Sequence, residues 1–406
     1  MSLHIGIIGG GAAGLMAAVQ ALRLGMKVTV LEGGNRAGKK LSATGNGRGN
    51  FTNLSLSTDK YPGIDPAFLQ AGFSCFDQYD AIAFFESIGI YSRIRNGYVY
   101  PRSEQAQALA AALLRELERL GGSIATDCKV TGIGPAEGGF TVTAGEKTFE
   151  FDRLILAAGG ATAPKTGSDG SGFALARMLG HIVKDPVPAL TGLAFKKCAL
   201  AKAAGVRTQA AVSLRIDGEE AAAESGEIQI TEQGISGIPV MNLSRYAAMA
   251  LAVGKQVELL TDFLPEWDWE EGRRIVLNCE NYGGILPVKL ISALPQDPDS
   301  FYRMCRSFPL NITGIRDPEN AQVTCGGVCL REVNPDTMES TKVKGLYFAG
   351  EVLDVDGRCG GYNLQWAWTS GAIAAHGAAG VPCSHRDPDP GLLKRLEQAE
   401  LADRRK

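Results

Sequence analysis

The chain has little of what several common protein classes require. Its net charge of −3 comes from 41 basic and 44 acidic residues, which are interspersed along the sequence. This balance lacks the clustered positive charge of a nucleic-acid-binding surface, so no nucleic-acid partner is expected. No apolar run reaches the roughly 18 residues that a membrane-spanning helix needs. We therefore expect a soluble, cytoplasmic protein with no membrane partner.

The 9 cysteines are scattered, and none of them forms a Cys-x-x-Cys pair. Cys325 and Cys329 are separated by three residues, with no histidine close to them in the sequence. This spacing argues against a zinc site and against a dithiol redox motif, so we expect no metal and reduced thiols. With 406 residues, the chain exceeds the size of a single hydrophobic core, and two or three domains are expected.

What the chain does contain is a complete βαβ motif within residues 4–32. It runs as strand HIGII, turn GGGAAG, helix LMAAVQALRLG and strand KVTVLE. Gly9 permits the tight turn, Gly11 lets the backbone approach a pyrophosphate, and Gly14 lets the helix pack against the strand. Glu32 ends the second strand, where a carboxylate accepts hydrogen bonds from a ribose. The motif predicts a dinucleotide site, with FAD or NAD preferred over NADP.

The segment 33–53 favours FAD. It is rich in Gly, Asn, Ser and Thr and carries Lys39, Lys40 and Arg48. Small residues allow backbone contact and the cations offset phosphate charge, as an extended cofactor requires. NAD domains normally continue to a third strand without such a loop.

Later segments supply further contacts for a long cofactor. We expect strands within 121–133, with Val130 beside an adenine, and within 152–160 and 344–357. Glu351 follows the last of these, and a helix begins near Asn363. The positive end of that helix is suited to stabilising negative charge on a reduced flavin ring.

Between about residues 190 and 340 the pattern changes. Residues 212–231 alternate and turn like an antiparallel hairpin, and residues 269–297 read as short helices separated by Gly and Pro. We therefore expect an α/β chain with a split, doubly wound Rossmann-type FAD-binding domain. The predicted boundaries are 1–190 and 339–406 for this domain, and 191–338 for an inserted substrate or cap domain.

Three stretches of the sequence resemble one bacterial flavoprotein family. They are IGIIGGGAAGLMAA, GKKLSATGNGRGNFTN and the run from AQVTCGGVCL to WAWTSG. The family is the BaiN-like, or aminoacetone oxidase-like, FAD-binding family, which is distantly similar to the flavoproteins of fumarate reductase. The resemblance covers nearly the whole chain. It implies that the insert is a small β-barrel carrying a helical piece at about 266–308.

The resemblance also implies a set of FAD-contacting positions. They are Gly9, Gly11, Gly14, Glu32, Lys40, Ser42, Arg48, Asn50, Val130, Gly159, Gly350, Glu351, Gly361, Asn363 and Leu364, with Ala12, Ala13, Asn46, Gly47 and Ala158 beside them. One position departs from the pattern, because many relatives have Cys where this chain has Gly49. Chemistry that needs a thiol there is excluded.

The leading functional hypothesis, by resemblance, is NAD(P)H-linked reduction of an activated C=C, as in a 3-oxo-Δ4 or Δ6 steroid or bile acid. Two alternatives are an oxidase of a small amine such as aminoacetone, giving H₂O₂, and a redox flavoprotein without turnover of its own. Disulfide reductases are excluded, since no Cys pair lies in 33–53 and no second complete G-x-G-x-x-G is present. NAD(P)H would therefore have to dock at the flavin face or arrive from a partner.

The catalytic residues stay open at this point. The 4 histidines, in no flavin-facing motif, argue against covalent flavin attachment and against a His relay. Arg48, Tyr98 and Tyr362 are candidate proton donors. Thr324, Gly326 and Gly327 lie either close to the flavin ring or in a turn at a domain junction.

Overall fold

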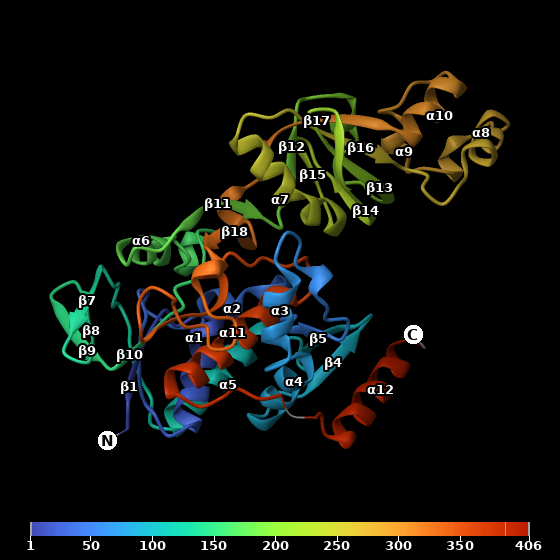
Figure 1. The fold of residues 1–406 in the computed structure, drawn as a ribbon. Coiled ribbons are helices and arrows are strands. Elements are labelled where there is room, and N and C mark those ends of the chain that lie inside the picture. Colours follow the sequence, from blue (N-terminus) through green and yellow to red (C-terminus); the bar gives the residue numbers. More distant parts are fainter. Residues whose placement is uncertain (1, 386, 405–406) are drawn as a thin grey trace. The chain divides into compact units, whose positions relative to one another are not determined.

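The computed structural model describes residues 2–385 and 387–404, and the chain divides into two compact units (Figure 1). The first unit comprises Met1–Pro186 and Thr324–Lys406, and the second comprises Val187–Val323. The sequence placed these divisions at 190/191 and 338/339. Residues 324–338 fall in the first unit because β18 (Val323–Val328) pairs with β11 (Val183–Ala189) where the chain leaves and re-enters it.

A five-stranded sheet forms the centre of the first unit. Its strands lie in the order β19-β10-β1-β2-β6, and every neighbouring pair is parallel. Their bounds are β1 His4–Ile8, β2 Lys27–Leu31, β6 Ser123–Ala125, β10 Arg153–Leu156 and β19 Leu346–Phe348. The sheet thus joins strands from both ends of the chain, which confirms the split doubly wound architecture.

The strands are apolar on both faces because helices cover them. Ile5, Ile7 and Val30 are fully buried, as expected for a parallel sheet between helical layers. Helix α1 (Ala12–Arg23) packs against α11 (Tyr362–Ala379) and α5 (Ala106–Arg119). A Cβ at Gly371 would lie 2.6 Å from the carbonyl oxygen of Ala13, so the contact between α1 and α11 requires glycine.

One predicted strand is shorter than expected. It ends at Ala125, and Val130 lies outside any strand. Asp127 has a left-handed φ of 50°, which interrupts an extended backbone. The N–H groups of Asp127 and Cys128 instead donate to the carbonyls of Gly34 and Glu32, at 2.9 and 2.8 Å.

Smaller elements surround the sheet. They are α2 Lys39–Ser42, β3 Thr52–Asn53, α3 Pro66–Phe73, α4 Gln78–Ser87, β4 Ser92–Arg95, β5 Tyr98–Pro101, β7 Gly132–Ala136, β8 Gly139–Ala144, β9 Lys147–Phe151, α6 Ser171–Met178 and α12 Pro390–Arg404. Strands β3, β5 and β4 form one antiparallel sheet, and β7, β8 and β9 form another. Among the described residues, no helix is long and apolar enough to cross a membrane.

The second unit is a closed six-stranded barrel with short helices (Figure 1). The strands are β12 Leu193–Phe195, β15 Gly234–Ser236, β14 Glu219–Ile230, β13 Arg207–Ile216, β16 Val257–Asp262 and β17 Phe308–Ile315, and the helices are α7 Ile238–Ala252, α8 Trp269–Leu277, α9 Val288–Ile291 and α10 Pro298–Arg306. Strands β13 and β14 form the predicted hairpin. Helices α8–α10 correspond to the expected helical piece.

A buried polar network ties together distant segments of the first unit. His181 Nε2 lies 2.9 Å from Ser340 Oγ, and its Nδ1 lies 3.0 Å from Glu332 Oε2. Ser340 Oγ already accepts the N–H groups of Lys342 and Val343. Its own hydrogen is therefore directed to Nε2, so the imidazole is neutral with its proton on Nδ1. Burial lowers the pKa of His181, although Glu332 opposes the shift.

This network predicts a pH-dependent stability. A histidine whose pKa is lowered by folding binds fewer protons in the folded state, so its contribution is present above the unfolded value of 6.5 and is lost as pH falls below it. His181→Ala should lower the free energy of unfolding by about 2–4 kcal/mol at neutral pH. Denaturant titrations at several pH values would check both statements. An unchanged pH profile in the variant would contradict this role.

Candidate dinucleotide site

The glycine-rich turn between β1 and α1 is shaped by close packing at two of its glycines. Gly9 has φ +103°, and a Cβ there would collide with the carbonyl oxygen of Ala157. A Cβ at Gly14 would collide with the carbonyl oxygen of Gly9. At Gly11, by contrast, a Cβ would meet no protein atom within 4 Å. The space in front of Gly11 is open to a ligand.

The N-terminus of α1 faces that open space, and its N-cap residue provides no side-chain acceptor for the first N–H groups of the helix. Gly11 is the N-cap residue and supplies no side-chain hydrogen bond. The first-turn N–H groups of Ala12 and Ala13 have no intrahelical acceptors. A helix N-terminus of this kind holds phosphate through its N–H groups and its dipole.

Glu32 links this turn to the loop after β2. Its Oε2 accepts the N–H of Gly10 at 2.9 Å, and its Oε1 accepts the N–H of Gly34 at 2.7 Å. These bonds orient the carboxylate beside the glycine turn. Each oxygen keeps further acceptor capacity, which suits a ribose hydroxyl.

Lys40 and Glu351, predicted separately from the two ends of the chain, form an ion pair. Lys40 Nζ lies 2.8 Å from Glu351 Oε2 and 3.4 Å from the hydroxyls of Thr162 and Ser168. Glu351 Oε1 accepts the N–H of Thr324 at 2.7 Å. The pair therefore holds the loop after β2 against the segments that follow β10 and β19.

Sequence reasoning missed Thr162 and Ser168 and left Thr324 open. Thr324 Oγ1 accepts the N–H of Ala161 at 2.8 Å, and a Cβ at Gly160 would lie 2.7 Å from Thr324 Cβ. Thr324 thus belongs to the polar cluster around Glu351. Only the GGAT and TGSDGSG stretches could have drawn attention to these hydroxyls, and many turns share such a composition.

The loop from Gly45 to Asn50 has an unusual backbone. Gly45, Asn46 and Gly47 have consecutive left-handed φ values of 58°, 54° and 81°, and Arg48 is exposed beside them. Asn50 Oδ1 is buried and has no hydrogen-bond partner. Because a buried acceptor without a donor is costly, this atom fits a ligand that brings an N–H or O–H group.

The N-terminus of α11 lies next to Asn50. Its N-cap, Gly361, has φ +93° and supplies no side-chain hydrogen bond, and a Cβ there would lie 2.8 Å from Asn50 Oδ1. Asn363 uses its side chain to hold the preceding loop, since it accepts the N–H of Gly357 at 2.8 Å and donates to the Gly357 carbonyl at 2.9 Å. The first-turn backbone N–H groups, including that of Leu364, therefore remain for a ligand.

The remaining predicted FAD contacts include Gly350, Gly159, Ser42 and Val130. Gly350 follows β19 with φ +76°, and a Cβ there would lie 2.7 Å from Ala13 Cβ, so it sits at the start of α1. Gly159 follows Ala158 with φ +76°, close to Ser168. Ser42 Oγ donates to the Gly38 carbonyl at 2.8 Å. Val130 is buried in the segment between β6 and β7.

Two of the three candidate proton donors lie close together. A Cβ at Gly360 would be 2.9 Å from Tyr98 and 3.1 Å from Tyr362. Burial, together with Tyr98, raises the pKa of Tyr362 to about 12. Burial also raises the pKa of Tyr98, which Arg358 partly opposes. Both hydroxyls are therefore protonated at neutral pH, and Tyr98 is the more exposed of the two.

The fold and this turn define a Rossmann-type dinucleotide-binding protein. The family described as the HI0933-like protein Rossmann domain matches residues 3–377. The chain belongs to this family.

Curated relatives match over almost the whole chain. The 3-dehydro-bile acid delta(4,6)-reductase of Clostridium scindens is 42% identical over 93% of this chain and 100% of its own length. The ribosomal RNA dihydrouridine synthase of Escherichia coli is 29% identical over 90% of this chain and 95% of its own length. The Haemophilus influenzae protein of the same name is 28% identical over 91% of this chain and 96% of its own length.

Solved structures show the same fold at low identity. The 3-ketosteroid delta1-dehydrogenase of Sterolibacterium denitrificans has a TM-score of 0.54 at 14% identity, covering 93% of this chain and 99% of that one. A flavocytochrome c3 fumarate reductase has a TM-score of 0.50 at 13% identity, and the match covers 93% of this chain and 78% of that one.

Proposed function

We propose that the protein is an FAD-dependent oxidoreductase that reduces a C=C bond conjugated to a carbonyl, with NAD(P)H as the electron donor. The substrate class is a 3-oxo-Δ4 or Δ6 steroid or bile acid. The observation that carries this proposal is the 42% identity to a bile acid delta(4,6)-reductase over that protein's full length. FAD, when bound, supplies the hydride.

The names of the curated relatives support the same bond type. Dihydrouridine differs from uridine by two hydrogens on a C=C that is conjugated to a carbonyl. A 3-oxo-Δ4 steroid has the same kind of bond, and a Δ6 bond is conjugated to the 3-oxo group through Δ4. The protein named for uridine acts on ribosomal RNA. A net charge of −3 with interspersed charges does not favour such a polyanion here. A small-molecule enone is therefore the better substrate class.

The residues of the glycine turn and the two helix N-termini fit FAD. The N-terminus of α1 at Gly11 would hold the pyrophosphate, and Glu32 would accept a ribose hydroxyl. The buried Asn50 Oδ1 and the uncapped N-terminus of α11 would face the flavin. Lys40, paired with Glu351, would lie at the phosphate side of the same cofactor.

Tyr98 is the residue that we assign to the carbonyl of the enone. Its hydroxyl is protonated at neutral pH and partly exposed, whereas the neighbouring Tyr362 is buried. A protonated phenol that donates to the substrate carbonyl draws electron density from the β-carbon, where hydride is added. We assign the reaction to the reducing cytoplasm, where nine free cysteines are stable.

One anaerobic titration tests this function against an oxidase. NADH or NADPH is expected to bleach the visible absorbance of the purified protein, and a 3-oxo-Δ4 steroid to restore it. An oxidase would instead be bleached by aminoacetone and recover its colour in air with release of H₂O₂. If nicotinamides leave the absorbance unchanged and aminoacetone bleaches it, the reductase proposal is wrong. If neither the nicotinamides nor aminoacetone change the visible absorbance, the result would favour a flavoprotein without turnover of its own.

A further inference from the structure

Two cysteines that are 308 residues apart in sequence meet in the first unit. Cys75 lies between α3 and α4, and Cys383 lies between α11 and α12. The Sγ of Cys383 donates to the Cys75 carbonyl oxygen at 3.8 Å. The side chains of the two cysteines also interact electrostatically, and both residues are partly exposed. No sequence motif predicted that these two cysteines lie close together.

We propose that Cys75 and Cys383 form a reversible disulfide that fastens the C-terminal segment to the rest of the first unit. Both residues and all the contacts that support the proposal lie within this unit. The proposal does not depend on the function proposed above, and no cofactor takes part in it.

The two thiols are chemically unequal. The hydrogen bond from Cys383 lowers the pKa of Cys75 to about 7, although burial and the carboxylates of Asp336 and Asp80 act in the opposite direction. The same hydrogen bond, together with burial, raises the pKa of Cys383. The thiolate form is therefore favoured at Cys75 relative to Cys383. Because the thiolate is the nucleophile, Cys75 is the residue that reacts first.

The oxidation balances with hydrogen peroxide as the oxidant. The Cys75 thiolate attacks one peroxide oxygen, the O–O bond breaks, and Cys75 becomes a sulfenic acid with release of hydroxide. The Cys383 sulfur then attacks the Cys75 sulfur and loses its proton. Hydroxide leaves from the sulfenic acid, so two thiols and one peroxide give one disulfide and two waters.

The chain after Cys383, which includes α12, is held by exposed ion pairs and by two leucines of α12 that are buried in the core. His385 Nδ1 lies 2.8 Å from Asp80 Oδ2, and Arg395 pairs with Glu86 at 2.7 Å. Exposed ion pairs of this kind contribute little stability. Leu392 and Leu396 of α12 are buried. A covalent bond at Cys383 would restrict how far the segment can detach.

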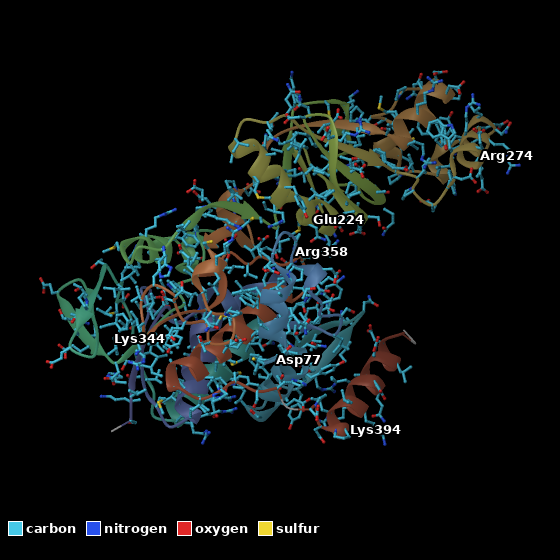
Figure 2. All side chains as sticks on the ribbon, viewed as in Figure 1. Asp77, Glu224, Arg274, Lys344, Arg358 and Lys394 are labelled. Atoms are coloured by element: carbon cyan, nitrogen blue, oxygen red, sulfur yellow. The ribbon has the colours of Figure 1, made fainter. Side chains whose placement is uncertain are left out.

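Fastening the segment also affects the hairpin that carries Tyr98. Asp403 of α12 accepts the N–H of Asn96, which lies in the turn between β4 and β5, at 2.9 Å. Figure 2 labels Asp77, just before α4, and Lys394, on α12. Oxidation would therefore stabilise α12 against the turn that precedes Tyr98.

A metal ion is the competing occupant of this region. Ligand atoms of Asp77, Asp80 and His385 lie within 4.8 Å of one another. However, Asp77 Oδ1 accepts the N–H groups of Tyr79 and Asp80 at the start of α4, and Asp80 Oδ2 faces His385. These carboxylates are already used as a capping box and an ion pair, so a metal ion would have to displace hydrogen bonds that the protein already makes.

The experiment treats the full-length protein with stoichiometric H₂O₂, unfolds it in denaturant and then alkylates the remaining thiols, because three of the nine cysteines are buried in the folded protein. The reduced protein should take up nine labels and the oxidised protein seven, nine minus the two cross-linked cysteines, with a mass loss of two hydrogens. Peptide mapping should recover a Cys75–Cys383 peptide that dithiothreitol separates. Proteolysis within the C-terminal segment should slow by about tenfold on oxidation.

Serine variants provide the controls. Cys75→Ser and Cys383→Ser should each abolish the cross-link and the protection, whereas Cys279→Ser, at another partly exposed thiol in the second unit, should change neither. Oxidation of Cys75 to sulfinic acid without a cross-link would overturn the proposal, as would a cross-link without protection of the segment. Stoichiometric zinc in the wild type that both variants lose would also overturn it in favour of a metal site.

Discussion

Gly11→Val is expected to remove FAD from a protein that still folds. The backbone at Gly11 has φ −82°, which valine adopts, and a Cβ there meets no protein atom within 4 Å. The substitution therefore causes no clash within the chain. Its side chain would occupy the space that we propose for the pyrophosphate at the N–H groups of α1, and losing two charge-assisted hydrogen bonds weakens binding by roughly 100-fold or more.

Two other glycines separate loss of the cofactor from loss of the fold. Gly14→Val should prevent folding, because its Cβ would collide with the Gly9 carbonyl oxygen. Gly134→Val should fold and retain FAD, since its Cβ also meets no atom within 4 Å and it lies in β7, outside the glycine turn. The measurement is the flavin absorbance per protein after desalting, with circular dichroism as the test of folding. A Gly11→Val protein that stays fully yellow would refute this placement of the cofactor.

Tyr98→Phe is expected to slow reoxidation of the reduced protein by the enone by roughly 100-fold or more, the usual contribution of a positioned acid. Bleaching by NADPH should keep its rate, because the phenol acts on the enone carbonyl and not on the nicotinamide. Stopped-flow absorbance measures the two half-reactions separately. In the wild type, the raised pKa of Tyr98 keeps the hydroxyl protonated, so reoxidation should be independent of pH between about 6 and 9.

Two further tyrosines test the assignment of Tyr98. Tyr91→Phe, at an exposed position just before β4, should leave both half-reactions unchanged. Tyr362→Phe should have a smaller effect than Tyr98→Phe, because the Tyr362 side chain is buried. If only the Tyr362 variant loses reoxidation, the proton donor is Tyr362 and the role of Tyr98 is wrong.

Local pattern was sufficient wherever an element is defined by residues close in sequence. The first βαβ motif, the hairpin of β13 and β14 and the start of α11 lie where periodicity and turn residues indicated. The strand expected within 121–133 was too long, because Asp127 takes a left-handed conformation that pairs its N–H with the Gly34 loop. A contact between separate loops leaves no periodic signal in either of them.

The sequence by itself determined the class of protein. A glycine turn has to be made of glycine where backbone atoms touch, as at Gly9 and Gly14, and an acidic residue has to end the second strand where it meets the turn. These requirements are local, so they can be read from spacing alone. Lys40 was predicted from the composition of the segment 33–53, where cations offset phosphate charge, and its contact with the cofactor stays a prediction.

Only the tertiary structure decided which distant residues act together. The ion pair of Lys40 with Glu351, the unpartnered Asn50 beside Gly361, and the meeting of Cys75 with Cys383 each join segments from opposite ends of the chain. Such contacts arise because the sheet places β19 beside β10 and because α11 packs on α1. The order of strands in a sheet is set by packing over the whole unit, and no local spacing encodes it.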